Sequence, residues 1–299
     1  MPKKRSKRWF LRGFLCGIAV LLLLICGGIA YMRHEADSLT VNRYDVISET
    51  WTLPPLRIAV AADFHVGNKP EALERLAEIV DAINAEEPDL ILLPGDFAAG
   101  LFPIQAGDPR RIAEVLSRLK APLGVYAVLG NHDHWQKAER FTRAFEEVKL
   151  PLLENRSVVL EFAGKPFRLV GVIDGWTQEE PPWAELLPEE SIPRIVMTHG
   201  PDIFETLPES TALADAGHTH GGQIVLPFAG PLYVPSRHGR RYASGLITEG
   251  KNNIFVTTGT GTSNVSLRLN CPPEIAILTL KGVAPIVPEP TVRVVEATP

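Results

Sequence analysis

The feature that most constrains this chain is a series of short apolar segments, each of which ends in residues able to bind a metal. Five such ends follow one another along the sequence. They read Asp63-Phe64-His65, Gly95-Asp96, Gly130-Asn131-His132-Asp133, Thr198-His199-Gly200 and Gly217-His218-Thr219-His220. In open α/β sheets, ligands bind outside the carboxyl ends of the strands. The sequence therefore predicts an α/β fold in which the five ends meet at one site.

The spacing within two of these ends favours metal binding. Side chains two residues apart on a strand point to the same face of the sheet. Asp63 and His65 can therefore present two ligands together, and His218 and His220 can do the same. Glycines stand beside the other ends, where they let the backbone turn sharply. A single Asp-x-His or Gly-Asp pair occurs by chance in many chains, whereas the complete ordered series is specific.

Strand and helix patterns alternate in the first half of the chain. Apolar runs predict strands over 56–62, 89–93 and 123–129, and apolar residues at helical spacing predict helices over 71–87, 109–119 and 136–148. The second half favours strands, over 157–162, 167–172, 194–197, 213–216, 254–257 and 274–280. Two sheets packed together with helices outside would cover so many strands most simply. We expect one catalytic domain over 56–281, after a linker over 33–55 and before a proline-punctuated tail over 282–299.

The N-terminal segment has the composition of a membrane anchor. Residues 13–32 carry no charge, and a helix of this length, at about 1.5 Å per residue, spans about 30 Å of hydrocarbon. The flank over 1–12 holds six basic residues, which predicts a single-pass inner-membrane protein with its catalytic domain outside the cytoplasm. A cleaved signal peptide is the alternative, but no small-residue cleavage site follows Gly28.

The same flank leaves the export route open. The segment Ser6-Lys7-Arg8-Trp9-Phe10-Leu11-Arg12 resembles the twin-arginine export signal, with a lysine in place of the first arginine. If that route is used, the protein crosses the membrane folded and loaded with metal. A basic flank to an ordinary anchor explains the same residues.

Charge is distributed unevenly along the chain. The whole sequence has a net charge of −5, but after residue 33 the remaining 23 basic residues face 35 acidic ones, a net charge of −12. Binding to a phosphate backbone needs clustered basic residues, so we expect no surface that coats nucleic acid. Three cysteines, two of them inside the apolar run, cannot form a disulfide framework.

The ordered series resembles the calcineurin-like metallophosphoesterase superfamily, whose motifs D-x-H, G-D, G-N-H-[DE], H and G-H-x-H all occur here in order. The resemblance covers residues 56–281, and it implies a four-layer αββα sandwich behind the N-terminal transmembrane helix. Segments 217–223, 226–228 and 271–275 are similar to the membrane-anchored YkuE/YaeI-type phosphodiesterases. Gly95-Asp96 lacks the downstream Asp-Arg-Gly of the superfamily's protein phosphatases, which disfavours a phosphoprotein substrate.

The superfamily resemblance also implies two divalent metal ions. The first would be held by Asp63, His65, Asp96 and His220, and the second by Asp96, Asn131, His199 and His218. Asp96 would bridge the two. This mixture of ligands suits Mn, Fe, Zn, Co or Ni better than Ca. In such a site a metal-bridging hydroxide attacks phosphorus, and His132 would protonate the leaving oxygen or stabilise the transition state.

Two further groups of residues keep two roles open. Arg237, Arg240 and Arg241 form a dense basic patch in a loop rich in proline and glycine. They bind either a second phosphate or an anionic head group of the substrate, or they form a solvated loop. Asp133 either orients a metal ligand or caps a helix.

These observations predict a metal-dependent phosphoric ester hydrolase, tethered to the bilayer, that cleaves a phosphodiester or pyrophosphate, with lipid-derived substrates included. One alternative is the UDP-2,3-diacylglucosamine pyrophosphate hydrolase of lipid A synthesis. The predicted topology opposes it, because that nucleotide sugar is cytoplasmic. The other alternative is a metal-binding scaffold without turnover, which His132 beside a full ligand set opposes.

Overall fold

The computed structural model describes residues 3–100, 106–173, 175–177, 181–187, 192–209 and 211–283, with side chains from residue 9 onward. The α-helices are α1 (Lys3–Asp37), α2 (Pro70–Ala85), α3 (Pro109–Leu116), α4 (Asn131–Trp135), α5 (Ala138–Glu147) and α6 (Trp183–Leu186). The 3-10 helices are η1 (Pro201–Thr206), η2 (His220–Gly222) and η3 (Gly239–Tyr242). The strands are β1 (Thr40–Ser48), β2 (Leu56–Val60), β3 (Leu90–Pro94), β4 (Val125–Val128), β5 (Arg156–Phe162), β6 (Lys165–Val172), β7 (Arg194–Thr198), β8 (Leu213–Ala216), β9 (Val225–Leu226), β10 (Gly230–Pro231), β11 (Gly245–Glu249), β12 (Asn252–Val256) and β13 (Glu274–Gly282).

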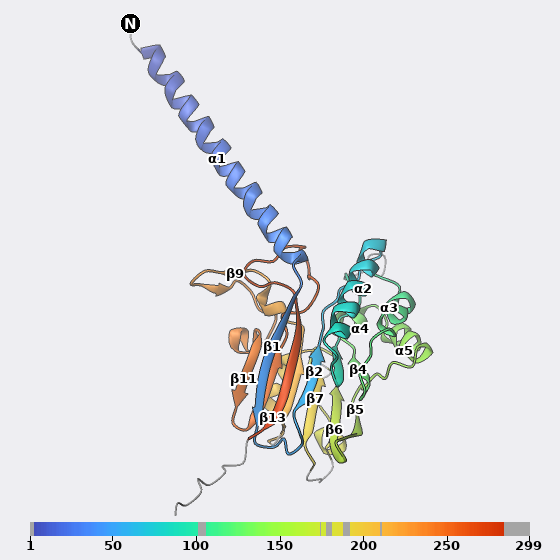
Figure 1. The fold of residues 1–299 in the computed structure, drawn as a ribbon. Helices are drawn as coiled ribbons and strands as arrows, with labels where there is room; N and C mark the ends of the chain where they lie inside the picture. Colours follow the sequence, from blue (N-terminus) through green and yellow to red (C-terminus); the bar gives the residue numbers. More distant parts are fainter. Residues whose placement is uncertain are drawn as a thin grey trace, which may run out of the picture.

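Two sheets carry the site (Figure 1). The first has the strand order β1-β13-β2-β3-β4, in which β13 is antiparallel to β2 and the other neighbours are parallel. The second has the order β11-β12-β8-β7-β6-β5, with parallel central strands and antiparallel pairs at both edges. Since β2, β3 and β4 run parallel, as do β7 and β8, the carboxyl ends of each group lie together.

The two sheets bury three apolar layers. Alternate residues of β2 pack into two of these layers. Ile58 and Val60 lie in the core between the sheets, and Ala59 lies in the core beneath α2, α3 and α5. A third core lies on the outer face of the second sheet, where side chains of η1, α6 and η3 pack. The expected four-layer αββα sandwich is therefore confirmed.

The helices follow the predicted pattern closely. α2 begins with Pro70 at its first turn, where a missing N–H costs nothing, and buries Leu76, Ile79, Val80 and Ile83 on one face. These residues lie in the core beneath the first sheet. The observed helix differs from the prediction by one residue at its start and two at its end.

The expectation of a linker over residues 33–55 is wrong, because this range contains β1. β1 pairs in parallel with β13 from Thr40 to Ser48 and forms an edge of the first sheet. Most of its side chains are only partly buried or exposed, so its sequence is of mixed polarity and does not give the apolar run of a central strand. We propose that the folded domain begins at β1 instead of at residue 56.

α1 projects away from the sandwich in Figure 1. Its segment Trp9–Asp37 is long and apolar enough to span a membrane, and an 18-residue stretch within it has a mean hydropathy of 2.6 and is not buried. At the other end of the chain, β13 extends to Gly282. Residues 284–299, most of the predicted tail, lie outside the described residues.

Candidate metal centre

The seven predicted metal ligands meet where strands from both sheets end. Each lies just beyond the carboxyl end of a strand: Asp63 and His65 follow β2, Asp96 follows β3, Asn131 follows β4, His199 follows β7, and His218 and His220 follow β8. All seven are buried. The strand order places β2 beside β3 and β7 beside β8, so the site forms where the two sheets meet face to face.

Three of these side chains form a first cluster. The ligand atoms of Asp63, His65 and His220 lie within 4.8 Å of one another. His220 Nε2 lies 3.5 Å from Asp63 Oδ1 and 3.0 Å from His65 Nε2. Two imidazole nitrogens and a carboxylate oxygen therefore point into the same small space.

A second cluster lies next to the first. The ligand atoms of Asp96, His199 and His218 also lie within 4.8 Å of one another. His199 Nε2 lies 3.1 Å from Asn131 Oδ1 and 3.2 Å from His218 Nδ1. The amide oxygen thus joins two imidazoles and a carboxylate.

Asp96 lies between the two clusters. Its Oδ2 atom is 3.6 Å from His65 Nε2 of the first cluster and 3.3 Å from His199 Nε2 of the second. Its Oδ1 atom accepts a hydrogen bond of 2.9 Å from the backbone N–H of His132, which fixes the carboxylate plane. Oδ2 therefore faces both clusters.

The backbone at the site adopts an uncommon conformation. Five of the seven predicted ligands have a positive φ: Asp63 (55°), His65 (44°), Asp96 (55°), His218 (70°) and His220 (51°). Residues other than glycine held in this region cost about 1–3 kcal/mol each and cluster at functional sites. Hydrogen bonds from the Asp63 amide to Gly95 O (2.9 Å) and from the His65 amide to Asp96 O (3.1 Å) hold two of these turns. The fold thus maintains strain where the ligands gather.

Gly217 allows the two sheets to approach at the site. The Asp63 carboxylate accepts hydrogen bonds of 3.0 and 3.1 Å from the His218 amide, so it lies directly against this turn. A Cβ at Gly217 would lie 2.5 Å from Asp63 Oδ2 and 2.8 Å from the Cβ of Ala62. Only glycine fits there without displacing Asp63, a predicted ligand.

Burial and mutual charge set the protonation of the site. Burial raises the pKa of Asp63 to about 7, and the Asp96 charge adds to this effect. Burial also acts to raise the pKa of Asp96, but His199 and His65 hold it well below its usual range. Burial lowers the pKa of His65 to about 4 and that of His218 to about 3. These histidines are neutral at pH 7, the form that binds metals.

The residues present fit divalent metal ions. His218 Nε2 is buried without a hydrogen-bond partner among the described residues. His65 Nε2 and His220 Nε2 face each other at 3.0 Å, with the Asp63 carboxylate beside them. Each neutral imidazole has only one N–H, so these rings have too few protons to hydrogen-bond all the nitrogen and carboxylate oxygen lone pairs that face one another here. Bound cations would satisfy those lone pairs. The mixture of nitrogen and oxygen donors suits transition metals.

Other side chains orient the ligands. His199 Nδ1 lies 2.7 Å from the Pro94 carbonyl, and a proton held there leaves Nε2 free to bind a metal. The Asp133 carboxylate accepts the amides of Gly130, Phe97 and Ala98 at 3.0 to 3.2 Å. Asp133 therefore fixes the turns that follow β3 and β4, including the start of α4, and does not cap the helix that was expected from residue 136.

Arg268 is a buried residue at the site for which the sequence gives no motif. Its guanidinium donates to the carbonyls of Thr258 (2.7 Å), Gly261 (2.6 Å) and Cys271 (2.9 Å). It also lies 3.3 Å from Nδ1 of His220. Arg268 thus ties the loop after β12 to His220, the last of the predicted ligands. A lone arginine in an apolar stretch does not reveal this role.

His132 lies at the edge of both clusters. Its ring centre is 4.7 Å from that of His65, and its Nδ1 is 3.3 Å from the Gly100 carbonyl. One of its ring nitrogens also lies within 4.8 Å of ligand atoms of His65 and Asp96. The histidine is thus close enough to act on a group bound at the site.

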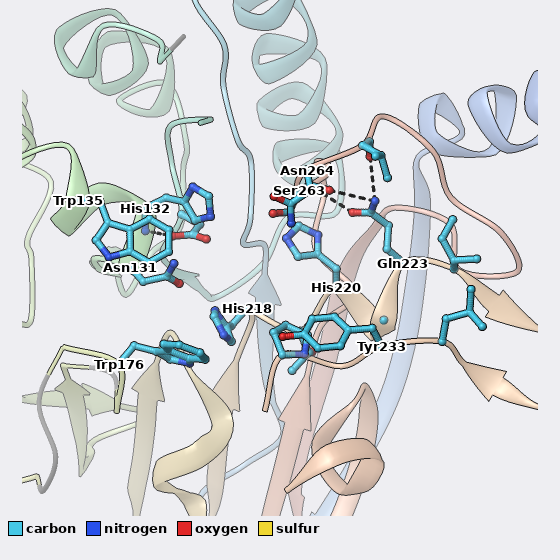
Figure 2. A pocket seen from close by; sticks show the side chains of 17 residues that line it. Asn131, His132, Trp135, Trp176, His218, His220, Gln223, Tyr233, Ser263 and Asn264 are labelled. Carbon is cyan, nitrogen blue, oxygen red and sulfur yellow. Dashed lines mark hydrogen bonds between the residues drawn. The ribbon is translucent and has the colours of Figure 1, made fainter. Parts of the chain in front are cut away.

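A cavity of about 350 Å³ opens directly above the ligands (Figure 2). Its polar floor includes Asp96, Asn131, His132, His218 and His220. Its walls are mostly apolar and are formed by Trp135, Trp176, Ile224, Leu232, Tyr233, Pro235 and Val265. The two tryptophans stand on one side and Tyr233 on the other. These wall residues carry no sequence motif, because apart from Trp135 at the end of α4 they lie in irregular segments without a periodic pattern.

The three arginines do not line this cavity, and they are not brought together as one clamp. Arg237 contacts Asp202 and lies beside Gly175, the neighbour of Trp176. Arg240 donates to the Pro231 carbonyl at 2.8 Å. Arg241 is paired with Glu205 at 3.0 Å and Glu249 at 2.7 Å.

Comparison with known proteins agrees with this geometry. Residues 56–233 match the family model described as calcineurin-like phosphoesterase. Phosphodiesterase YaeI of Escherichia coli (strain K12) is 34% identical over 284 residues, covering 92% of this chain and 99% of that protein. The uncharacterized metallophosphoesterase YkuE of Bacillus subtilis (strain 168) is 29% identical over 290 residues, covering 94% of this chain and 99% of that protein.

A more distant relative carries a lipid-related name. UDP-2,3-diacylglucosamine pyrophosphatase LpxG of Chlamydia trachomatis is 26% identical over 324 aligned positions, covering 88% of this chain and 97% of that protein. The matched region contains all seven predicted ligands and His132. The chain therefore belongs to the calcineurin-like phosphoesterase family, and it is a metal-dependent phosphoric ester hydrolase.

Proposed function

We propose that this protein hydrolyses a phosphodiester or pyrophosphate with two divalent transition metal ions. The observation that carries the proposal is the place of Asp96 Oδ2, which faces His65 of one three-ligand cluster and His199 of the other. The first ion would be held by Asp63, His65, Asp96 and His220. The second would be held by Asp96, Asn131, His199 and His218.

The chain's own residues supply the remaining chemistry. When bound, the ions would polarise the phosphoryl oxygens and activate a water for in-line attack. His132 would hold a proton at the ring nitrogen facing the site and deliver it to the leaving oxygen, a role worth about 100- to 10,000-fold in rate. The Gly100 carbonyl, 3.3 Å from the other ring nitrogen, Nδ1, is positioned to accept a hydrogen bond from it and so to orient the ring. Trp135 and Trp176 would enclose the leaving group on one side of the cavity.

Hydrolysis of two nitrophenyl esters tests this function. The full chain, loaded with Mn²⁺, should cleave bis-p-nitrophenyl phosphate faster than p-nitrophenyl phosphate, and a chelator should abolish both activities. Preference for the monoester would make the protein a phosphomonoesterase. Absence of turnover in the metal-loaded protein would favour the metal-binding scaffold.

A UDP-2,3-diacylglucosamine pyrophosphatase is the second candidate. The similarity to LpxG and the apolar cavity walls favour it. The basic flank before α1 opposes it, because it favours export of the catalytic domain away from that cytoplasmic substrate. Direct assay of UDP-2,3-diacylglucosamine hydrolysis by the full chain in detergent separates the two candidates.

We propose that α1 is a retained single-pass anchor in the inner membrane, with the catalytic domain outside the cytoplasm. The length and hydropathy of Trp9–Asp37 and the six basic residues before residue 13 support this topology. The substrate would then be a phosphoester present outside the cytoplasm, lipid-derived compounds included.

Among the three arginines, Arg240 is the one we propose as a contact for an anionic head group. The Arg240 side chain is exposed, and its recorded hydrogen bond among the described residues is to the Pro231 carbonyl. The charge of Arg241, by contrast, is neutralised by two glutamates. Arg240→Ala should raise KM for a lipid phosphodiester, and Arg241→Ala should not. Equal effects of the two changes would contradict this assignment.

A further inference from the structure

One loop joins the cavity to the end of the candidate membrane helix. Ser263, Asn264 and Val265 line the cavity above the ligands (Figure 2). Three residues later, the Arg268 amide donates a hydrogen bond of 3.0 Å to the carbonyl of Met32. Met32 is the last residue of the uncharged run over 13–32. The mouth of the cavity therefore lies at the level where the apolar run ends.

The end of α1 is attached firmly to the catalytic domain. The buried Glu35 accepts a hydrogen bond of 2.6 Å from the Cys271 amide through Oε1. Arg75 of α2 donates to the Asp37 carbonyl at 2.9 Å. β1 then begins at Thr40, whose amide bonds to the Pro273 carbonyl at 2.9 Å. Contacts on several sides fix the direction of the helix relative to the sandwich.

The hairpin of β9 and β10 lies beside the same end of α1 in Figure 1, and it exposes large apolar side chains. Phe228, at the turn of the hairpin, is fully exposed. Leu232 and Tyr233, which follow β10, are 63% and 71% exposed. Val265 on the neighbouring loop is 51% exposed. Exposed apolar groups gathered in this way mark a contact surface.

The hairpin and the loop behave as one wall of the site. The Val225 amide donates to the Leu269 carbonyl at 2.8 Å, and Asn270 Nδ2 donates to the Val225 carbonyl at 2.8 Å. Gln223 Nε2 donates to the Val265 carbonyl at 2.8 Å. Ile224, Leu232 and Tyr233 line the cavity together with Val265. The apolar surface is thus continuous from the membrane helix to the floor of the site.

We propose that the hairpin over 224–233 and the loop over 263–268 rest in the interfacial layer of the bilayer that α1 spans, with the Phe228 side chain inserted. The cavity then opens onto the membrane and receives the phosphoester of an amphiphile resident in that leaflet. This inference rests on the proposed anchor and phosphoesterase function.

The chemistry of the surface matches this occupant. Aromatic side chains such as Phe228 and Tyr233 are favoured at the boundary between head groups and acyl chains. Arg240, bonded to the Pro231 carbonyl at the base of the hairpin, carries a positive charge beside them. Such a charge favours anionic head groups. An apolar wall next to it would accept the first methylenes of a lipid chain while the phosphoester reaches the ligands.

Fluorescence quenching in bilayers tests the position of the hairpin. Full-length Phe228→Trp protein, reconstituted in phosphatidylcholine bilayers brominated near the head group, should lose more tryptophan emission than the parent protein. Ile47→Trp is the matched control, because Ile47 is 61% exposed but lies at the far end of β1 from α1. At about 3.3 Å per residue, β1 carries it more than about 20 Å away. No added quenching from Phe228→Trp, or equal quenching from both variants, would overturn the proposal.

Activity on two phosphodiesters tests the consequence for the substrate. Phe228 does not line the cavity. Phe228→Asp should raise KM for hexadecyl p-nitrophenyl phosphate embedded in bilayers about tenfold or more, and should change kcat/KM for soluble bis-p-nitrophenyl phosphate less than about twofold. Ile47→Asp should change neither. Equal loss on both substrates would overturn the membrane role.

The two arms separate this inference from the function on which it rests. If Phe228→Trp is quenched but the parent protein hydrolyses neither substrate, the phosphoesterase function is contradicted and the membrane position of the hairpin is still supported. Hydrolysis without quenching would contradict the membrane position alone. Conversion of a dimer to a monomer by Phe228→Asp, without quenching, would assign the hairpin to a second copy of the chain and overturn the proposal.

Discussion

At the scale of single residues, the site depends on side chains whose backbones are held in a strained conformation. Five of the predicted ligands have a positive φ, a conformation that residues other than glycine adopt at a cost. The backbone directs their side chains inward from turns, not from regular strands. Metal ions would hold the ligand side chains in place, and the buried hydrogen bonds of the turns already hold the backbone.

Asp96 and His132 should respond differently to substitution. Asp96→Asn removes the charge that faces both clusters, so it should lower the occupancy of both metals. His132→Ala should leave both metals bound and slow turnover by about 100-fold or more, since it removes only the proton donor. Elemental analysis and steady-state hydrolysis of bis-p-nitrophenyl phosphate measure the two effects. Metal loss from His132→Ala as severe as that from Asp96→Asn would make His132 a ligand.

Gly217 should be intolerant of even one methyl group. Gly217→Ala places a Cβ 2.5 Å from Asp63 Oδ2, so it should displace that carboxylate and weaken metal binding at the first cluster. Gly164→Ala is the control, because Gly164 has a φ of +75° but nothing within 4 Å of the added carbon. The control should lower the melting temperature without loss of metal. Equal metal content in the two variants would contradict the steric argument.

At the scale of elements, β8 buries a carboxyl group that the chemistry does not use. Both oxygens of Asp215 are buried without a hydrogen-bond partner among the described residues. Burial raises the pKa of this side chain well above its usual value, so folding favours its protonated form. In the unfolded chain it ionises near pH 4. Folding therefore becomes less favourable through this group as pH rises above about 4.

Asp215→Asn should relieve that penalty. The variant keeps the shape of the side chain but cannot ionise in the unfolded state. The melting temperature of the variant minus that of the parent should therefore be more positive at pH 8 than at pH 5. Thermal unfolding of the metal-free full chain in detergent measures it. A difference that is the same at both pH values would show that Asp215 has a partner in solution.

Central elements of the fold could be predicted from the sequence, whereas edge elements could not. β3 is apolar and buried throughout, and β2 and β8 are largely buried and are apolar apart from one polar residue each, Arg57 and Asp215, so the positions of these strands follow from the sequence alone. β1 and β11 expose alternate residues at the edges of their sheets and give no such signal. The expected linker over 33–55 was wrong for this reason.

Motif residues of the site could be predicted, whereas the residues that support them could not. Each predicted ligand lies at a strand end, so sheet topology brings the set together. Arg268 acts through backbone carbonyls, and Trp176 contributes only an apolar surface. Neither function needs a sequence pattern. The arginine loop was predicted from composition, which does not show that Arg241 pairs with Glu249 of β11 and with Glu205 of η1, 36 residues away in sequence.

At the scale of the whole molecule, the sandwich and α1 form one unit with the cavity on the side of the helix. The predicted orientation follows from the six basic residues before the apolar run. Alkaline phosphatase fused after residue 299 should be active, because that enzyme needs an environment outside the cytoplasm. The intact protein should also sediment with membranes. An inactive fusion, or a soluble form that begins after residue 30, would contradict the retained anchor.

The central claim is that two metal ions, bridged by Asp96, are needed for phosphodiester hydrolysis. The most direct test is a titration of the metal-free full chain with Mn²⁺, in which bound metal per chain and the rate of bis-p-nitrophenyl phosphate hydrolysis are followed together. The account predicts that the rate stays low until the first site fills and reaches its maximum at two ions per chain. Full activity at one ion per chain, or two bound ions with no hydrolysis, would contradict it.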